Sequence, residues 1–278
     1  MQNTISELLK DTENKFTNAA IEDPAANAEF LLAHIIGVRR TWLAANADYN
    51  LTEEELAKYT DVVNKKLTGV PMAYIIGSAD FCGHSFIVDE DVLIPRPETE
   101  ELVQFSMDML PAKPRRLLDM CTGSGAIVCT LAMKYRNTEV VGVDNSMPAL
   151  LTAKKNIEKF DLPVQLIYGD LFENVDGAFD AIITNPPYIP SADLPGLSPE
   201  VQREPASALD GGETGLDIIT QIILYSPDYL TPGGLLAIEH CKGQEEDIKK
   251  IFDMNVWQSV ASRKDMYGIN RFIFAIKK

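Results

Sequence analysis

The stretch Leu117-Leu118-Asp119-Met120-Cys121-Thr122-Gly123-Ser124-Gly125 decides the fold of this chain, because an apolar run breaks into a glycine-rich turn that opens a helix. Glycine lets the backbone approach a ligand closely, and the N–H groups of a helix N-terminus bind polar ligand groups. A dinucleotide site would need a third glycine at position 128, where this chain has Val128. The pattern therefore predicts a nucleoside-type cofactor without a pyrophosphate.

Strand and helix patterns alternate along the chain after this stretch. Strands are predicted at 116–120, 139–144, 164–168, 179–184, 235–239, 256–262 and 271–276. The clearest helices between them are predicted at 126–135, 147–159, 216–230 and 244–253. Such alternation is typical of a parallel sheet with helices on both faces. We therefore predict an α/β fold with a seven-stranded sheet.

Polar residues follow the first four predicted strands. Asp144 ends the second strand, where a carboxylate can hold two ribose hydroxyls, and Asp170-Leu171 follows the third, where they can bind the adenine amino group and ring. Asn185-Pro186-Pro187-Tyr188 follows the fourth. Ligands of open α/β folds bind at the carboxyl ends of the strands. The ordered series predicts S-adenosylmethionine as the cofactor, bound by Cys121, Thr122, Gly123, Ser124, Gly125, Asp144, Asp170, Leu171 and Asn185.

The Asn-Pro-Pro-Tyr turn has the composition of a site for a planar NH2 group. The Asn185 side-chain oxygen and the Pro186 carbonyl can each accept one N–H, and the Tyr188 ring can cover the flat group. We therefore predict catalytic roles for Asn185, Pro186 and Tyr188, and substrate contacts for these three and Pro187. A Pro-Pro turn that merely ends a strand is the alternative for the tetrapeptide alone.

The N-terminal part of the chain has a different pattern. Helical spacing and capping signals, such as Thr52 with Glu55, predict a helical bundle over residues 1–70. Short alternating runs around Gly83 predict a β-hairpin connector over residues 71–95, and the cofactor-binding domain then takes residues 96–278. The segment 189–215 is the longest irregular one and is predicted to be a functional loop.

Composition excludes several classes of protein. The formal net charge is −16, and residues 1–75 hold 7 Lys and Arg against 11 Asp and Glu, which disfavours direct binding of nucleic acid. No stretch is apolar enough for a membrane span, and the first residues do not resemble a signal peptide. The four cysteines lack metal-ligand spacing and predict reduced thiols. We expect a cytoplasmic monomer without a metal.

With these motifs, the chain resembles S-adenosylmethionine-dependent methyltransferases that modify amino groups, and more closely the protein-(glutamine-N5) methyltransferases of peptide-chain release factors. The Asn-Pro-Pro-Tyr turn alone is shared with adenine-N6 and guanine-N2 methyltransferases. The run Ile94-Pro95-Arg96-Pro97-Glu98-Thr99-Glu100 and the helical N-terminal module narrow the resemblance. Further matching segments are 122–127, 169–172, 185–189, 204–205, 208–209, 211–212, 233–234 and 239–240.

The resemblance implies a Rossmann-like class I methyltransferase sheet with a small N-terminal helical domain that binds class 1 release factors. The implied acceptor is the glutamine of their Gly-Gly-Gln motif. Cys121 departs from the family pattern, which has glycine there, so its backbone must keep a negative φ or accept strain. Asp265, Gly268, Arg271 and Phe272 match a final signature, for which we expect an antiparallel hairpin.

Three other functions remain open at this point. The first is a glutamine methyltransferase that acts on a ribosomal protein, and the second is a methyltransferase of exocyclic amines in RNA or DNA. The third is a cofactor-binding protein without catalysis, against which the intact turn from Asn185 to Tyr188 argues. The sequence leaves the roles of Glu98, Asp119 and Glu239 undecided.

Overall fold

The computed structural model describes residues 4–278, which form two compact units. The smaller unit contains the described residues up to Gly77 together with Pro199–Arg203, and the larger unit contains Ser78–Ser198 and Glu204–Lys278. The predicted hairpin therefore belongs to the larger unit. Within residues 4–278, no helix is long and apolar enough to cross a membrane.

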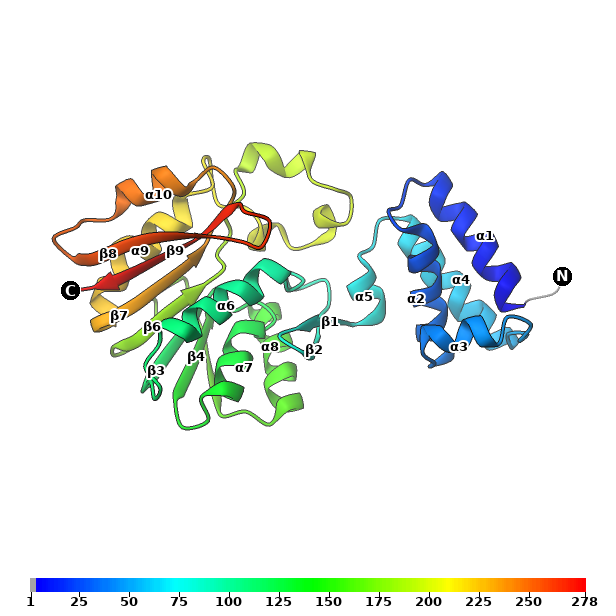
Figure 1. Ribbon diagram of the computed structural model, residues 1–278, viewed down its shortest axis with the longest axis horizontal. Coiled ribbons are helices and arrows are strands. Elements are labelled where there is room, and N and C mark those ends of the chain that lie inside the picture. Colours follow the sequence, from blue (N-terminus) through cyan, green and yellow to red (C-terminus); the bar gives the residue numbers. More distant parts are fainter. Residues whose placement is uncertain (1–3) are drawn as a thin grey trace. The chain divides into compact units, whose positions relative to one another are not determined.

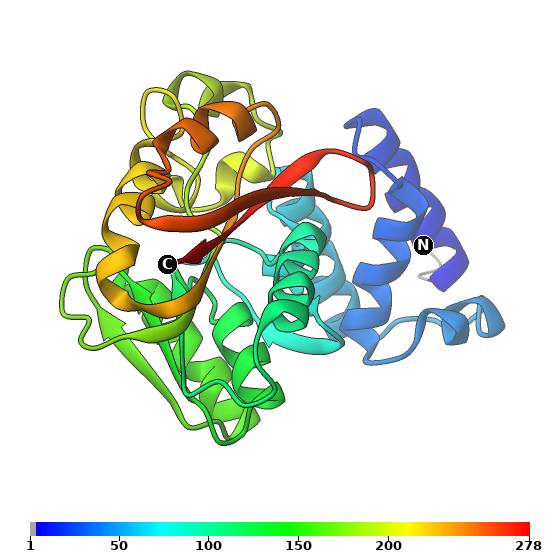
Figure 2. The ribbon, with the colours of Figure 1, turned by 60° about the vertical axis from the view of Figure 1, so that its left-hand side comes forward.

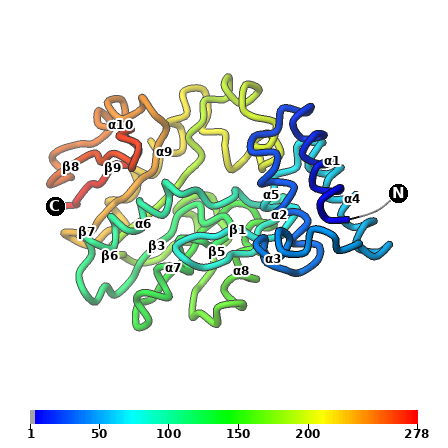
Figure 3. Tube along the Cα trace, turned by 45° about the vertical axis from the view of Figure 1, so that its right-hand side comes forward, coloured from blue at the N-terminus to red at the C-terminus, as the bar shows by residue number. Residues whose placement is uncertain are grey.

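The smaller unit is helical, as the capping signals predict. Its helices are α1 (Ile5–Asn18), α2 (Pro24–Ile36), α3 (Arg40–Ala45), α4 (Glu53–Leu67) and α5 (Met72–Ile76). Helices α1, α2 and α4 lie side by side (Figure 3) and bury one apolar cluster that includes Phe16, Leu31 and Tyr59. Capping boxes at the start of α1 and α4 confirm the pairing of Thr52 with Glu55.

The start of α2 differs in detail from what its sequence indicates. The pair Asp23-Pro24 predicts an N-cap followed by the first helical residue, and α2 does begin at Pro24, but Asp23 has a φ of +48° and its side chain makes no capping hydrogen bond. The Asn27 side-chain amide donates to the carbonyls of Glu22 and Asp23 instead. The helix therefore begins where the sequence indicates, by a different capping interaction.

The end of α4 holds the short segment Pro199–Arg203. The Lys66 ammonium is 3% exposed and pairs with Glu200, and the Arg203 guanidinium donates to the Thr68 carbonyl at 2.9 Å. A buried ammonium is costly without a partner, so this ion pair fixes the segment on the helical unit.

The larger unit is built on a seven-stranded sheet with the order β5-β4-β3-β6-β7-β9-β8 (Figure 1). The parallel strands are β3 (Arg116–Met120), β4 (Glu139–Asp144), β5 (Val164–Tyr168), β6 (Phe179–Thr184) and β7 (Leu230–Glu239). Strands β8 (Trp257–Lys264) and β9 (Asn270–Lys277) form the expected antiparallel hairpin. The α/β fold predicted from the sequence is confirmed.

Helices cover both faces of this sheet (Figure 2). On one face lie α6 (Pro97–Met109), α7 (Ala126–Lys134) and α8 (Met147–Phe160), and on the other lie α9 (Asp217–Tyr229) and α10 (Glu245–Ile251). Successive strand residues point to opposite faces, so Leu117 and Leu118 enter different apolar clusters. Buried polar side chains at the ends of the strands include Thr184 and Glu239.

The hairpin of β1 (Ser78–Phe81) and β2 (His84–Ile87) is fixed to α8 by one buried side chain. The amide of Asn156 donates to the carbonyls of Ile87 and Ser124, both at 2.9 Å, and accepts from Ile87 N at 2.7 Å. Asn156 is fully buried. One side chain therefore joins the hairpin, α8 and the glycine-rich turn.

The segment between β6 and α9 contains the short 3-10 helices η1 (Ser191–Gly196), η2 (Val201–Arg203) and η3 (Ala206–Ala208). Glu204, which is 5% exposed, accepts from the Ile94 backbone N–H at 3.0 Å and pairs with the Arg96 guanidinium. These contacts tie the segment to the residues that precede α6.

Asn156→Ala tests the role of this amide. The substitution leaves two carbonyls and one N–H without partners, so we expect the free energy of unfolding of the larger unit to fall by about 3 kcal/mol. Guanidinium unfolding measures the loss. The exposed Asn255→Ala is the control, with an expected change below about 0.5 kcal/mol; equal effects of the two substitutions would contradict the assignment.

Candidate active site

A cavity of about 250 Å³ lies at the carboxyl ends of β3, β4, β5 and β6. Six of the predicted cofactor residues line it, namely Cys121, Gly123, Asp144, Asp170, Leu171 and Asn185. Pro187 of the Asn-Pro-Pro-Tyr turn also lines it. The four strand ends meet because β4, β3 and β6 pair in parallel with matched register.

Asp144 holds the glycine-rich turn in place. Its Oδ2 accepts from Gly123 N at 2.8 Å and its Oδ1 accepts from Ser146 N at 2.9 Å. Burial raises the pKa of this carboxyl although the N–H groups act in the opposite direction. Each carboxylate oxygen keeps a further lone pair for a ligand hydroxyl, which fits the predicted contact with a ribose.

Asp119 also holds the glycine-rich turn in place. Its Oδ2 accepts from the Thr122 hydroxyl at 2.5 Å and from Val128 N at 3.0 Å, and the residue is fully buried. Burial, followed by the nearby Asp144 charge, raises the pKa of Asp119 to about 7 against the two hydrogen bonds. Asp119 therefore orients the turn, and Thr122 bonds to it without lining the cavity.

Cys121 has φ +61°, so this non-glycine residue takes the left-handed backbone rather than a negative φ. That conformation costs roughly 1 to 2 kcal/mol for a residue with a side chain. Cys121 lines the cavity, as does Gly123 two residues later. Cysteine at this position therefore takes the backbone conformation that favours glycine, and its side chain makes that conformation strained.

Asn185 is the predicted residue with the most informative contacts. Its Nδ2 donates to the Thr99 hydroxyl at 2.9 Å. Its Oδ1 is buried, and no group among the described residues donates to it. An unsatisfied buried acceptor is costly in a folded protein, and this one belongs to a residue that lines the cavity. The oxygen is therefore available to a donor on a bound ligand.

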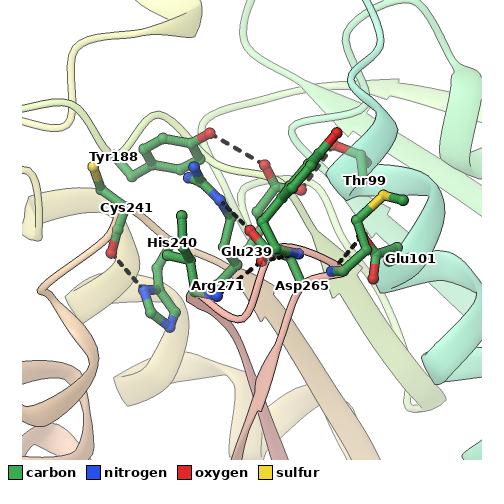
Figure 4. Close-up of polar contacts among 11 residues, drawn as sticks. Thr99, Glu101, Tyr188, Glu239, His240, Cys241, Asp265 and Arg271 are labelled. Atoms are coloured by element: carbon green, nitrogen blue, oxygen red, sulfur yellow. Dashed lines mark hydrogen bonds and ion pairs between the residues drawn. The ribbon is translucent and has the colours of Figure 1, made fainter.

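Tyr188 takes part in a buried cluster (Figure 4). Its hydroxyl donates to Glu239 Oε1 at 3.1 Å, and the Thr99 hydroxyl donates to Glu239 Oε2 at 2.7 Å. Burial raises the pKa of Glu239 to about 7 against these hydrogen bonds, and burial also raises the pKa of Tyr188. The roles of Glu239 and Thr99 were not apparent from the sequence, because both lie far from residue 185 in the chain.

Several expected site residues do not line the cavity, namely Thr122, Ser124, Gly125, Pro186 and Tyr188. Ser124 and Gly125 belong to the same glycine-rich turn as Cys121 and Gly123, which do line the cavity. Sequence reasoning missed lining residues that include Asp91, Leu93, Pro205, Ser207, Asp210 and Ile218. Pro205 lies in a segment that the resemblance had marked, and Pro205, Ser207 and Asp210 lie in the predicted functional loop 189–215. Asp91, Leu93 and Ile218 carried no such signal.

Glu239→Gln is expected to change how stability depends on pH. The folded state holds the Glu239 proton more tightly than the unfolded state, so wild-type stability falls as the pH rises from about 4.5 to 7 and this contribution is then constant. The variant lacks that fall, and its stability relative to wild type should rise by up to about 3 kcal/mol over this range. Denaturant unfolding at pH 4.5, 6 and 8 measures the difference; a difference that does not vary with pH would refute the raised pKa.

Two segments of the chain match the models of known protein families. Residues 7–77 match the family model described as the PrmC N-terminal domain, and residues 101–194 match the methyltransferase small domain. Among solved structures, a methyltransferase from Pyrococcus furiosus is 19% identical, with a TM-score of 0.55 over 81% of this chain and 98% of that one. The T. thermophilus 16S rRNA methyltransferase RsmC is 22% identical, with a TM-score of 0.53 over 72% and 50% of the chains. These likenesses show the class I methyltransferase fold.

Two relatives cover nearly the whole chain. The release factor glutamine methyltransferase of Geobacter sulfurreducens is 38% identical and covers 97% of this chain and 95% of its own. That of Nitratidesulfovibrio vulgaris is 35% identical and covers 98% and 95%. The cavity, with the carboxylates of Asp144 and Asp170 in its wall, fits the S-adenosylmethionine that methyltransferases of this fold use. The chain is an S-adenosylmethionine-dependent methyltransferase and belongs to the release factor glutamine methyltransferase family.

Proposed function

We propose that this protein methylates the side-chain amide nitrogen (N5) of the glutamine in the Gly-Gly-Gln motif of class 1 peptide-chain release factors. The observation that carries the proposal is the buried, unpaired Oδ1 of Asn185 at the wall of the cavity. A primary amide has two N–H donors and therefore matches this acceptor. The names of the full-length relatives support the same acceptor class.

The residues at the strand end would act by alignment. An amide nitrogen is a weak nucleophile because its lone pair is delocalised into the carbonyl group. S-adenosylmethionine supplies a methyl group that is electrophilic because it is bonded to a sulfonium. Asn185 Oδ1 would accept one N–H of the glutamine and the Pro186 carbonyl the other, so that charge building on nitrogen is stabilised. The nitrogen becomes strongly acidic as the methyl is transferred, so no base is needed beforehand.

The distribution of charge supports a protein acceptor. The net charge of −16 would repel the phosphate backbone of a nucleic acid, and the first 75 residues carry more acidic than basic side chains. The helical unit, which matches the PrmC N-terminal domain, is the part that we propose to bind the release factor. We further infer that the enzyme is a monomer and that it is cytoplasmic; its four free cysteines support the second inference.

Labelled S-adenosylmethionine tests the acceptor. We expect the purified protein to transfer label to a class 1 bacterial release factor and not to a variant of that factor with Gln→Ala in the Gly-Gly-Gln motif. Scintillation counting and peptide mass spectrometry locate the label. Label on both factors would place the methyl group elsewhere, and transfer only to a ribosomal protein or to RNA would overturn the proposed substrate.

Asn185→Ala tests the alignment. The substitution removes the oxygen that we propose to accept an N–H of the glutamine amide, so we expect kcat to fall about a hundredfold. The dissociation constant for S-adenosylmethionine should change by less than about threefold, since Asp144 and Asp170 remain to bind it. Single-turnover kinetics and calorimetric titration measure the two quantities; loss of cofactor binding equal to the loss of kcat would contradict the role in transfer.

A further inference from the structure

The side chain of an asparagine can be placed in two orientations that exchange its oxygen and nitrogen. Only one of them turns an acceptor toward the cavity at Asn185. The other would present an NH2 group, which cannot bind the N–H of a glutamine amide. The rate of the proposed reaction therefore depends on what holds this amide in one orientation.

Thr99 supplies the contact on the other side of the amide. Its hydroxyl has a single proton, which it donates to Glu239 Oε2 at 2.7 Å. The same oxygen can then only accept, and it accepts from Asn185 Nδ2 at 2.9 Å. Thr99 is 5% exposed and Glu239 is 1% exposed, so water does not offer an alternative partner. The direction of one hydrogen bond thus fixes the direction of the next.

The sheet and helix α6 bring these three residues together. Thr184 pairs with Ile238 in the parallel register of β6 and β7, so the next residues, Asn185 and Glu239, lie level at the strand ends. Thr99 comes from the first turn of α6, at the end of the Ile-Pro-Arg-Pro-Glu-Thr-Glu run. Figure 4 shows Thr99 and Tyr188 directed at the Glu239 carboxylate from different elements.

Glu239 sets the direction of the whole chain of hydrogen bonds. An ionised carboxylate only accepts, and Glu239 accepts from Thr99 and from Tyr188. A proton on Oε2 would allow Glu239 to donate to Thr99, whose own proton could then turn toward Asn185. Among the described residues Glu239 has no ion pair, since Arg271 bonds to Asp265 at 3.0 Å. A buried carboxylate held only by two hydroxyls is costly for stability, which points to a functional reason for it.

We propose that Thr99 and Glu239 are positioning residues, which hold the Asn185 amide with Oδ1 toward the substrate through the hydrogen bonds Asn185 to Thr99 to Glu239. The inference rests on the proposed methylation of glutamine. Neither residue lines the cavity, so both act through Asn185. Tyr188 donates to Oε1 of Glu239, and Oε2 is left for Thr99.

Three substitutions test the role of Thr99. Thr99→Val keeps the shape and removes the hydroxyl, so kcat should fall about tenfold to a hundredfold while the dissociation constant for S-adenosylmethionine changes less than about threefold. Thr99→Ser keeps the hydroxyl and should retain kcat within about threefold of wild type. Thr130→Val is the matched control, since its buried hydroxyl bonds to the Ala126 carbonyl of its own helix, and kcat should stay within about twofold. Wild-type kcat in Thr99→Val, or equal losses in the valine and serine variants, would overturn the proposal.

The pH profile tests Glu239. The charged or titratable groups that face it are Glu98 from α6, Tyr188 after β6 and Arg271 from β9. Wild-type kcat should rise with pH through about 7 as Glu239 ionises, and Glu239→Gln should have a lower kcat without this rise. A variant that keeps the rise would remove Glu239 from the proposal.

A measurement that needs no methyl-accepting substrate separates this inference from the proposed function. Absence of methyl transfer by the wild-type enzyme to any release factor would refute the function and leave the orientation of Asn185 to be decided by NMR. In ¹⁵N-labelled protein the side-chain NH2 signals of Asn185, assigned by their loss in Asn185→Ala, should exchange slowly with solvent in wild type and in Thr99→Ser. They should exchange at least about tenfold faster in Thr99→Val. Equal exchange in all three proteins would refute the orienting role.

Discussion

The parallel pairing of β3 with β4 on one side and β6 on the other is the constraint on which the site depends. It places the end of β3 beside the ends of β4 and β6, which lie 24 and 64 residues further along the chain, at one edge of the sheet. At that edge the apolar core stops, and side chains such as Asp144 and Asn185 meet the cavity. A shift of one residue in the register would turn these side chains away from it.

Two buried carboxylates, Asp119 and Glu239, hold neighbouring polar groups in place beside the cavity. Asp119 fixes the glycine-rich turn through Thr122 and Val128, and Glu239 receives the hydroxyls of Thr99 and Tyr188. Burial raises the pKa of both carboxyl groups to about 7, because removal from water disfavours the charged form. The chain thus accepts a cost in stability at the two places where a polar group must be oriented.

Two buried side chains, Glu204 and Asn156, connect segments near this edge that are far apart in the chain. Glu204 joins the segment that leads into η3 to Ile94 and Arg96, and Pro205 and Ser207, which follow it in this segment and in η3, line the cavity. Asn156 joins the hairpin to the glycine-rich turn through Ile87 and Ser124. Both use one buried polar side chain to satisfy several partners, which holds segments that the seven-stranded sheet does not include.

The sequence by itself determined the elements and the cofactor edge, because periodicity, capping signals and the residues after each strand are local properties. It predicted all seven strands of the large sheet, the final hairpin, and Asp144, Asp170 and Asn185 at the strand ends. Only the tertiary structure decided the partners of those residues. Thr99 bonds to Asn185 across 86 residues of chain and to Glu239 across 140. The left-handed backbone of Cys121 was likewise visible only in the structure. Contacts between distant segments depend on how helices and strands pack in three dimensions, which no local pattern of residues records.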